Sequence, residues 1–358
     1  MKSSSAFIAD LPESFSAFTA GLIKPSLTAI MTAVVAFVFS GLWFLQSAED
    51  LVAGYPQLLA SGPGDDYAFI TAAALNVADT KPSRRGVAVL GASCLRAATD
   101  EVKIESELQN ADISERVFNL TTRGQSLWES IAIADYIVPG FGGVLLIDTN
   151  PLRFARGLST LETIMRNQRV GFRSPILVEL ALDANIPATP ATGYYAWDNR
   201  IYLRARLNKV FKNLLLGPVE HEHSRLSETI DKEKRNWVIE RITEDIKSYD
   251  EDVEVLLDAL SKLSTALSRS DSATIILIEP PINPNFIDTV IGRDFYARHM
   301  NRIRQYARST NIQFWEMNEE LAFGKSNFAD WCHLNNTHSR DEYSQLLTDN
   351  LIREFLRE

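Results

Sequence analysis

The sequence predicts an α/β protein with a doubly wound parallel sheet, a flavodoxin-like α/β/α sandwich, that follows an N-terminal apolar helix. Short runs that are apolar throughout indicate strands covered by helices on both faces; they lie at 86–90, 117–120, 144–147, 274–278 and 312–315. Helical patterns alternate with these runs, at 126–136, 286–308 and 339–356. This alternation is typical of parallel sheets.

The apolar helix is expected at 27–46, a stretch without a charged residue. About 20 helical residues cross the roughly 30 Å hydrocarbon layer of a membrane. Lys2 and Lys24 precede this stretch and Glu49 and Asp50 follow it, which favours a cytoplasmic N-terminus. We therefore expect a single-pass protein of the inner (cytoplasmic) membrane whose domain is periplasmic or otherwise extracytoplasmic.

A cleaved signal peptide is the alternative interpretation of this stretch. The segment before it is long, however, and the residues around Gln46-Ser47-Ala48 match a cleavage site poorly. We expect an uncleaved transmembrane anchor.

The expected organisation is a cytoplasmic segment 1–26, the anchor, a spacer 47–85 rich in Ala, Gly, Pro and Asp with a short helix or two that leads away from the membrane, and a domain over 86–358. Within the domain, residues 153–270 are too many for a simple crossover. Their helical patterns predict a mainly helical insertion at the edge of the sheet, beside the site.

Composition narrows the classes of function. Hydrophobic residues make up 46% and charged residues 23% of the chain, as in folded globular proteins, and the formal net charge is -10. Nucleic-acid binding depends on clustered cations that displace counterions from phosphates. Nucleic acid is therefore not an expected partner.

Five residues capable of chemistry stand after the predicted strands, where open parallel sheets bind ligands. Ser93 follows the first strand, Gly124 the second and Asn150 the third, and a loop after the last strand carries Asp330 and His333. A serine hydroxyl becomes a nucleophile when an imidazole takes its proton and a carboxylate orients that imidazole. A backbone N–H and an amide can stabilise the oxyanion that forms.

This order of residues resembles the SGNH (GDSL-like) hydrolase superfamily, in which Ser, Gly, Asn and an Asp-x-x-His pair come from separated blocks. The resemblance covers the predicted domain apart from the insertion. It implies that Ser93 is the nucleophile, that Gly124 and Asn150 form the oxyanion hole, and that Asp330 and His333 complete a catalytic triad. It implies no cofactor.

Two blocks depart from the family pattern. Gly-Ala-Ser at 91–93 replaces the usual Gly-Asp-Ser, and Asp-Thr-Asn-Pro at 148–151 replaces Gly-x-Asn-Asp. Such variation resembles the membrane-tethered branch that includes alginate O-acetyltransferase components and the D-alanyl transfer protein of teichoic acid modification. That likeness implies acyl transfer, with acetyl as the expected group, to a cell-envelope glycan together with a membrane-bound O-acyltransferase. An esterase of the same polymer and a catalytically silent scaffold protein are the alternatives.

Each site residue also has a purely structural interpretation. Ser93 can cap a helix, Gly124 can adopt a positive backbone angle, and Asn150 before proline suits a turn. Asp330 can likewise cap a turn, and His333 can lie on the surface. The joint order of the five favours the catalytic interpretation.

The two cysteines, Cys94 and Cys332, adjoin the predicted nucleophile and the Asp-x-x-His pair. An exported domain permits a disulfide between them, and two buried thiols are the alternative. The His-Glu-His run at 221–223 lacks further ligands at recognisable spacing, so we expect a loop and no metal. Tyr194, Tyr195 and Trp197 could stack on sugar rings or pack the insertion against the sheet.

Overall fold

The computed structural model describes residues 27–78, 85–221, 232–268 and 273–357. The predicted cytoplasmic segment 1–26 lies outside them. The chain divides into two compact units, Met1–Ser47 and Ala48–Glu358.

Helix α2 (Leu27–Gly54) contains the predicted anchor. It has 28 residues and a mean hydropathy of 2.0 over its most apolar window, so it is long and apolar enough to cross a membrane, although a signal sequence has the same properties. Its last turns belong to the second unit. There Ala48 and Val52 are buried, and Glu49 accepts a hydrogen bond from the hydroxyl of Tyr136.

The sheet has five parallel strands in the order β2-β1-β3-β4-β5, which is the flavodoxin-like order. Their bounds are β1 Arg85–Leu90, β2 Arg116–Asn119, β3 Gly142–Asp148, β4 Ala273–Ile278 and β5 Gln313–Trp315. All five predicted strands are confirmed. Their carboxyl ends therefore lie along one edge, as the site prediction requires.

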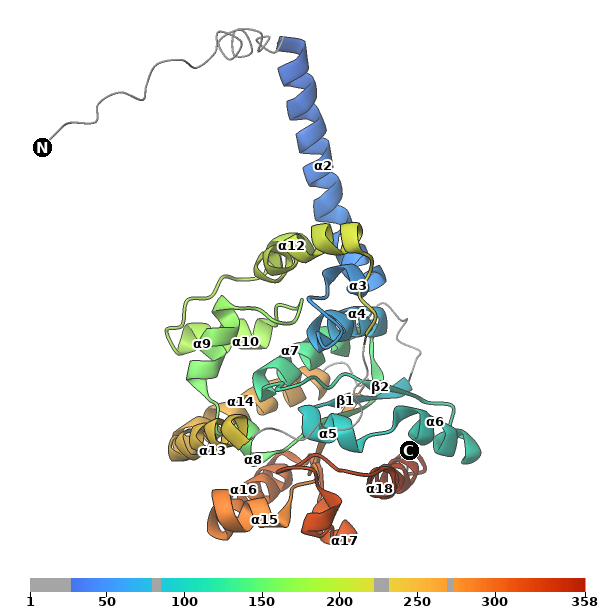
Figure 1. Cartoon of the computed structure of the whole chain (residues 1–358), viewed down its shortest axis with the longest axis vertical. Helices are drawn as coiled ribbons and strands as arrows, with labels where there is room; N and C mark the ends of the chain where they lie inside the picture. The colour runs from blue at the N-terminus through green and yellow to red at the C-terminus, as the bar shows by residue number, and fades with distance from the viewer. Residues whose placement is uncertain (1–26, 79–84, 222–231, 269–272, 358) are drawn as a thin grey trace, which may run out of the picture. The chain divides into compact units, whose positions relative to one another are not determined.

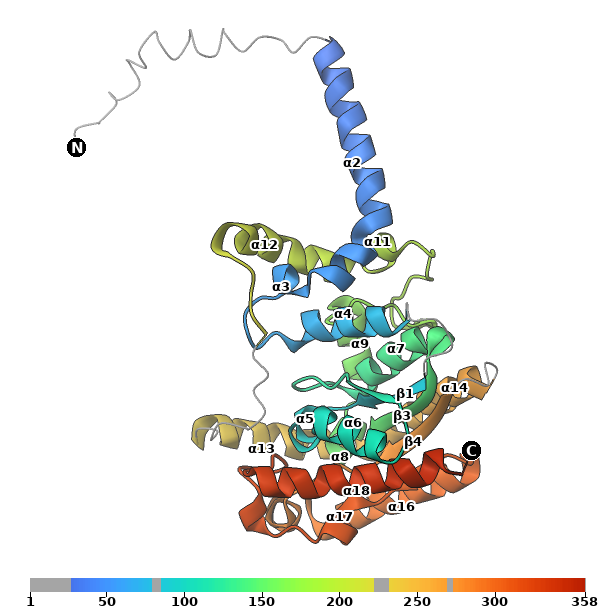
Figure 2. The same cartoon turned by 90° about the vertical axis from the view of Figure 1, so that its right-hand side faces the viewer.

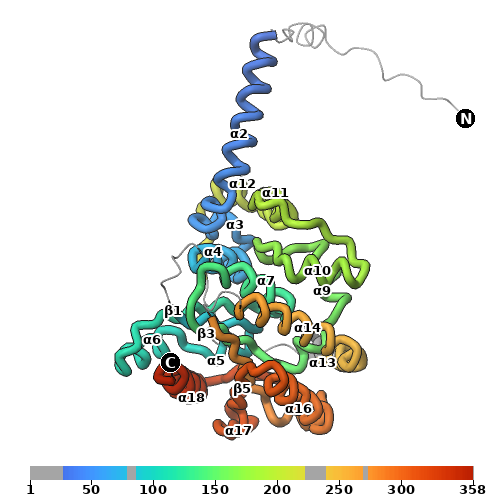
Figure 3. Tube along the Cα trace, turned by 180° about the vertical axis from the view of Figure 1, so that it is seen from behind, coloured from blue at the N-terminus to red at the C-terminus, as the bar shows by residue number. Residues whose placement is uncertain are grey.

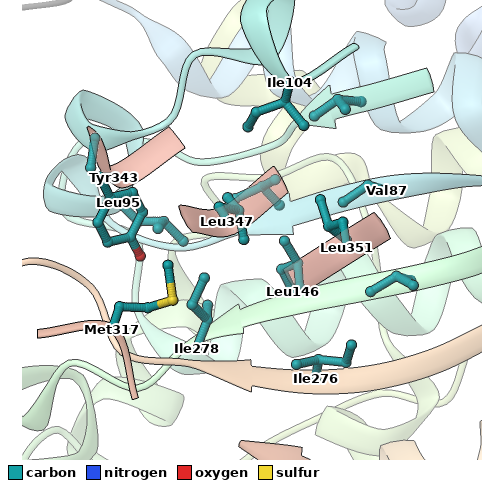
Figure 4. Packing of buried hydrophobic residues seen from close by; sticks show 14 of the residues in the cluster. Val87, Leu95, Ile104, Leu146, Ile276, Ile278, Met317, Tyr343, Leu347 and Leu351 are labelled. Atoms are coloured by element: carbon teal, nitrogen blue, oxygen red, sulfur yellow. The ribbon is translucent and has the colours of Figure 1, made fainter. Parts of the chain in front are cut away.

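One face of the sheet packs against α5 (Ser93–Ala98), α6 (Glu101–Asn110) and α18 (Thr337–Phe355). Alternate residues of the strands point to this face because the side-chain period of a strand is two. Figure 4 shows the resulting core, which includes Val87, Leu95, Ile104, Leu146, Ile276, Leu347 and Leu351. The first and last helices of the domain thus share one core.

The opposite face packs against α7 (Leu127–Ile137) and α14 (Tyr249–Ser268), which lie side by side (Figure 3). Both helices bury wide apolar faces, and a capping box of Ser126 and Glu129 fixes the start of α7. Buried side chains here include Leu145, Ile147, Ile275 and Leu277 from the strands. The domain is a three-layer sandwich.

The described part of the long connection between β3 and β4 is mainly helical. Its helices are α8 Pro151–Phe154, α9 Leu158–Arg166, α10 Pro175–Asp183, α11 Tyr195–Asp198, α12 Arg200–Leu216, α13 Lys232–Lys247 and α14. The connection differs from the expected insertion at the sheet edge, because it joins neighbouring strands and α14 covers a face. The apolar stripe of α14, with Leu256, Leu260 and Leu263, explains this placement.

Two further expectations need correction. The spacer 47–85 contains the short helices that were expected, α3 (Pro56–Leu59) and α4 (Asp66–Ala78), but α4 packs on the domain, because it buries Ala68, Ala72, Ala74 and Leu75 and contacts α7 (Figures 1 and 2). The helix predicted over 286–308 is interrupted. A π-helical turn at Ile287–Ile291 ends at Gly292, whose φ of 83° breaks the helix before α16 (Arg293–Thr310).

Candidate active site

A disulfide joins the two ends of the domain at the carboxyl edge of the sheet. Cys94 lies in the first turn of α5, and it is bonded to Cys332 with a Cα–Cα distance of 5.3 Å. Both cysteines are buried. Because Ser93 precedes one cysteine and His333 follows the other, the bridge brings the predicted nucleophile and the predicted base together.

Asp330 and His333 form an oriented pair. The Nδ1 atom of His333 lies 2.7 Å from Oδ2 of Asp330, while Oδ1 of Asp330 accepts the backbone N–H groups of Cys332 (3.0 Å) and His333 (2.9 Å). Nδ1 therefore donates to the carboxylate, and Nε2 keeps the lone pair that a general base needs. Burial opposes the charge on Asp330, but these hydrogen bonds outweigh it and lower the pKa of the carboxyl below its usual value. The carboxylate of Asp330 therefore stays charged at a lower pH than that of a free aspartate.

The loop that carries this pair is held by Asn283, which the sequence analysis did not single out. Its side-chain amide donates to the carbonyl of Asp330 (2.7 Å), and its backbone N–H donates to the carbonyl of Trp331 (2.9 Å). Asn283 follows β4 and precedes Pro284. An Asn-Pro step after a strand was the available signal, and its partner could not be read from the sequence.

Ser93 begins α5, directly after a turn that only glycine permits. A Cβ atom on Gly91 would lie 2.7 Å from Cβ of Asp148 and 2.9 Å from a methyl group of Leu95. Because the backbone at Gly91 lies this close to Asp148, the Asp148 carboxylate accepts a hydrogen bond from the backbone N–H of Ala92 at 3.1 Å. The turn that presents Ser93 is therefore fixed from the end of β3.

No direct hydrogen bond joins Ser93 to His333 in the described part of the chain. The catalytic contact between their side chains stays a prediction. Hydrogen bonds of catalytic groups are often long before substrate binds. The disulfide links the turn that carries Ser93 to the loop that carries His333. The hydrogen bond between their side chains is expected to form when substrate binds.

Asn150 lies close to this centre. It is buried, its Oδ1 caps α8 by accepting the N–H of Leu152 (3.0 Å), and its Nδ2 points to the sulfur of Cys94 at 3.8 Å. The amide donor is thus directed to the residue next to Ser93. A side-chain amide directed toward the nucleophile can serve as one of the hydrogen-bond donors of an oxyanion hole.

Gly124 is less clearly part of the site. It is exposed, has a φ of 65°, and its carbonyl accepts a hydrogen bond from Arg169 (3.2 Å). The loop itself is tied to the end of β3, because Arg153 donates both to the carbonyl of Gln125 (3.2 Å) and to that of Asp148 (2.7 Å). No hydrogen bond connects Gly124 to Ser93 or Asn150 among the described residues, so its oxyanion role stays a prediction.

His299 on α16 holds the residue that follows β3 through a hydrogen bond. No role was assigned to this histidine from the sequence. Its Nε2 lies 2.8 Å from the carbonyl of Thr149 and its Nδ1 lies 2.7 Å from the hydroxyl of Tyr249. Because a carbonyl only accepts, Nε2 carries the proton and Nδ1 accepts from Tyr249. The imidazole is fully buried and neutral, and burial lowers its pKa to about 4.

This histidine predicts acid sensitivity of the fold. An unfolded histidine binds a proton below about pH 6.5, whereas His299 in the folded protein resists protonation until about pH 4. Its contribution is complete above pH 6.5 and is lost as the pH falls, by about 2 to 3 kcal/mol between pH 7.5 and 4.5. Urea unfolding of wild type and His299→Gln at both pH values measures it. The wild type should lose that much more stability than the variant on acidification, and equal losses would contradict the assignment.

A cleft of about 180 Å³ opens beside the Asp-x-x-His loop, lined by Asp330, Trp331, Asn283 and Phe286 among others. A wider hollow, about 950 Å³, lies between α14 and α16 and is lined by none of the five predicted site residues. Asp330 is the one predicted site residue that lines the smaller cleft, which therefore adjoins the Asp-x-x-His loop.

The remaining sequence candidates lie elsewhere. His221 stacks on Phe69 and its Nε2 is 3.3 Å from a carboxylate oxygen of Asp66, while the other two residues of the His-Glu-His run are outside the described residues. Tyr194 and Trp197 are exposed. No protein-family model and no curated protein matches this chain.

Proposed function

We propose that this protein is an SGNH-type serine acyltransferase that passes an acyl group, acetyl being expected, to a cell-envelope polysaccharide through an acyl-Ser93 intermediate. The observation that supports this most is the disulfide that sets the oriented Asp330–His333 pair next to Ser93. The flavodoxin-like strand order and the position of Asn150 are consistent with it. The apolar α2 supports a membrane-tethered enzyme that works with an integral-membrane O-acyltransferase.

The reaction follows from the roles of these groups. Ser93 Oγ attacks the acyl carbonyl carbon while its proton passes to Nε2 of His333, and the donor's leaving atom departs with that proton. Asp330 stabilises the imidazolium, and the Asn150 amide stabilises the oxyanion. An acceptor hydroxyl then gives its proton to Nε2 and forms the new ester, and as the Ser93–acyl bond breaks Ser93 Oγ takes that proton from Nε2.

An acyl adduct tests this directly. The full chain in detergent, incubated with p-nitrophenyl acetate, should gain one acetyl group in intact-mass spectra. Ser93→Ala should gain none, because the attacking oxygen is absent. Ser159→Ala is a matched control, since Ser159 is an exposed serine in the first turn of another helix, α9, and it should acetylate like the wild type.

The fate of the adduct separates transferase from esterase. In the transferase, an added oligosaccharide should remove the acetyl group faster than water does and should itself become acetylated. Loss to water at the same rate with or without the sugar would replace transfer by hydrolysis. An adduct that survives Ser93→Ala would overturn the assignment of the nucleophile.

A further inference from the structure

Helix α12 carries an exposed apolar stripe that nothing in the described chain covers. Leu207, Phe211, Leu214 and Leu215 are all exposed, Leu215 by 86%. Their spacing of i, i+4, i+7 and i+8 places them on one face of the helix. With Leu216, α12 exposes more large apolar side chains than any other described helix except α2.

The opposite face of α12 packs on the domain through the buried side chains of Tyr202 and Asn213. Leu203, one turn before Leu207, is buried as well, so the exposed stripe begins at Leu207. The exposed stripe is therefore distinct from the face of α12 that packs on the domain. A second apolar face on a surface helix indicates a second binding partner.

The charge of α12 identifies the chemistry of that partner. Its cations are Arg200, Arg204, Arg206, Lys209 and Lys212, and it contains no acidic residue, although the chain as a whole has a net charge of -10. Arg204 and Lys212 are exposed beside the stripe. Just before the helix, the exposed ring of Trp197 lies under the guanidinium of Arg200. Apolar and cationic side chains on one helix, with a tryptophan beside it, are the composition of helices that lie in the interface of anionic bilayers.

The position of α12 along the folded chain agrees with this. The Asn213 amide donates to the carbonyls of Leu58 (2.9 Å) and Ala60 (2.8 Å), and Arg206 donates to the carbonyl of Leu59 (3.2 Å). These acceptors belong to α3 and its cap, which follow the end of α2 at Gly54 with only one residue between. The helix is thus fastened to the part of the domain that is nearest in the chain to the apolar stretch.

We infer that α12 is a membrane-surface helix that inserts its Leu207–Phe211–Leu215 stripe into the anionic bilayer that α2 enters. The exposed cations Arg204 and Lys212 hold the headgroups, and the apolar side chains enter the acyl boundary. The inference does not depend on acyl transfer, and a catalytically silent protein would show the same contact.

Spin labels on the full chain test this contact. Leu215→Cys offers one reactive thiol, because both native cysteines are in the disulfide. In nanodiscs of phosphatidylcholine with phosphatidylglycerol, a label at 215 should collide with dissolved oxygen and be shielded from a water-soluble nickel chelate. A label at Val102→Cys, an exposed apolar position on α6, should be accessible to the chelate. Phe211→Cys is a second position on the stripe.

Charge gives the second readout. Arg204→Gln and Lys212→Gln should lower the ratio of docked to undocked helix about fivefold for each cation removed. Equal chelate access at 215 and 102 would overturn the inference. Dipolar broadening between labels at 215, the sign of a second copy on the stripe, would overturn it as well.

Discussion

Ser93→Ala and His333→Ala should each abolish nearly all acyl transfer, with a loss on the order of 10⁴ to 10⁶ in the rate of the acylation step. Members of a triad act as a unit, because the hydroxyl without the base is a weak nucleophile and the base without the hydroxyl has nothing to activate. The double variant should therefore be hardly slower than either single variant. Asp330→Asn should lose less, since the carboxylate orients the imidazole and does not transfer the proton.

Stopped-flow release of p-nitrophenol from the acetyl ester measures this step. His338→Ala is the matched control, because His338 is an 81% exposed histidine in the following helix, and its rate should equal that of the wild type. Additive losses in the double variant would mean that Ser93 and His333 act separately. The catalytic interpretation would then give way to the scaffold alternative.

Removal of the disulfide should have the second largest effect. Cys94→Ser with Cys332→Ser opens a loop across 238 positions and should lower the free energy of unfolding by about 2 to 5 kcal/mol. Activity should fall too, because the loop of Asp330 and His333 then loses its covalent link to α5 and keeps its noncovalent contacts, among them the hydrogen bonds to Asn283. Urea unfolding with and without a thiol reductant gives the measurement.

The double serine variant supplies its own control. Reductant should destabilise the wild type and leave the variant unchanged, because the variant has no bond to reduce. Peptide mapping without reduction should recover the two cysteines as one linked fragment. Two free thiols in protein purified under oxidising conditions would contradict the bridge, but the triad hypothesis does not require it.

Local pattern predicted the strands well, because each is an apolar run whose neighbours along the chain cannot extend it. Local pattern failed to predict a helix boundary that a single residue determines. Hydrophobic periodicity predicted one helix that continues through Gly292, but the positive φ of Gly292 ends the helix there. Periodicity contains no information on backbone angles. The composition of 47–85 predicted a short helix or two, but it did not show that α4 packs on α7.

The site was predictable only where its residues are reactive types at strand ends. Ser93, Asn150, Asp330 and His333 could be named for that reason. Asn283 and His299 could not be named, because each acts through a hydrogen bond to a backbone carbonyl that is distant in the sequence. That carbonyl is 47 positions from Asn283 and 150 positions from His299. Such supports appear only when the chain is folded.

The bridge from α5 to the last loop also sets an order in time. A ribosome that adds 5 to 20 residues each second needs about 12 to 48 s to travel from Cys94 to Cys332. Cytosolic thiols stay reduced, so for an exported chain the two halves are joined only after translocation. On the proposed function, a newly made molecule would therefore be less active before export than at its destination, where the bridge can form.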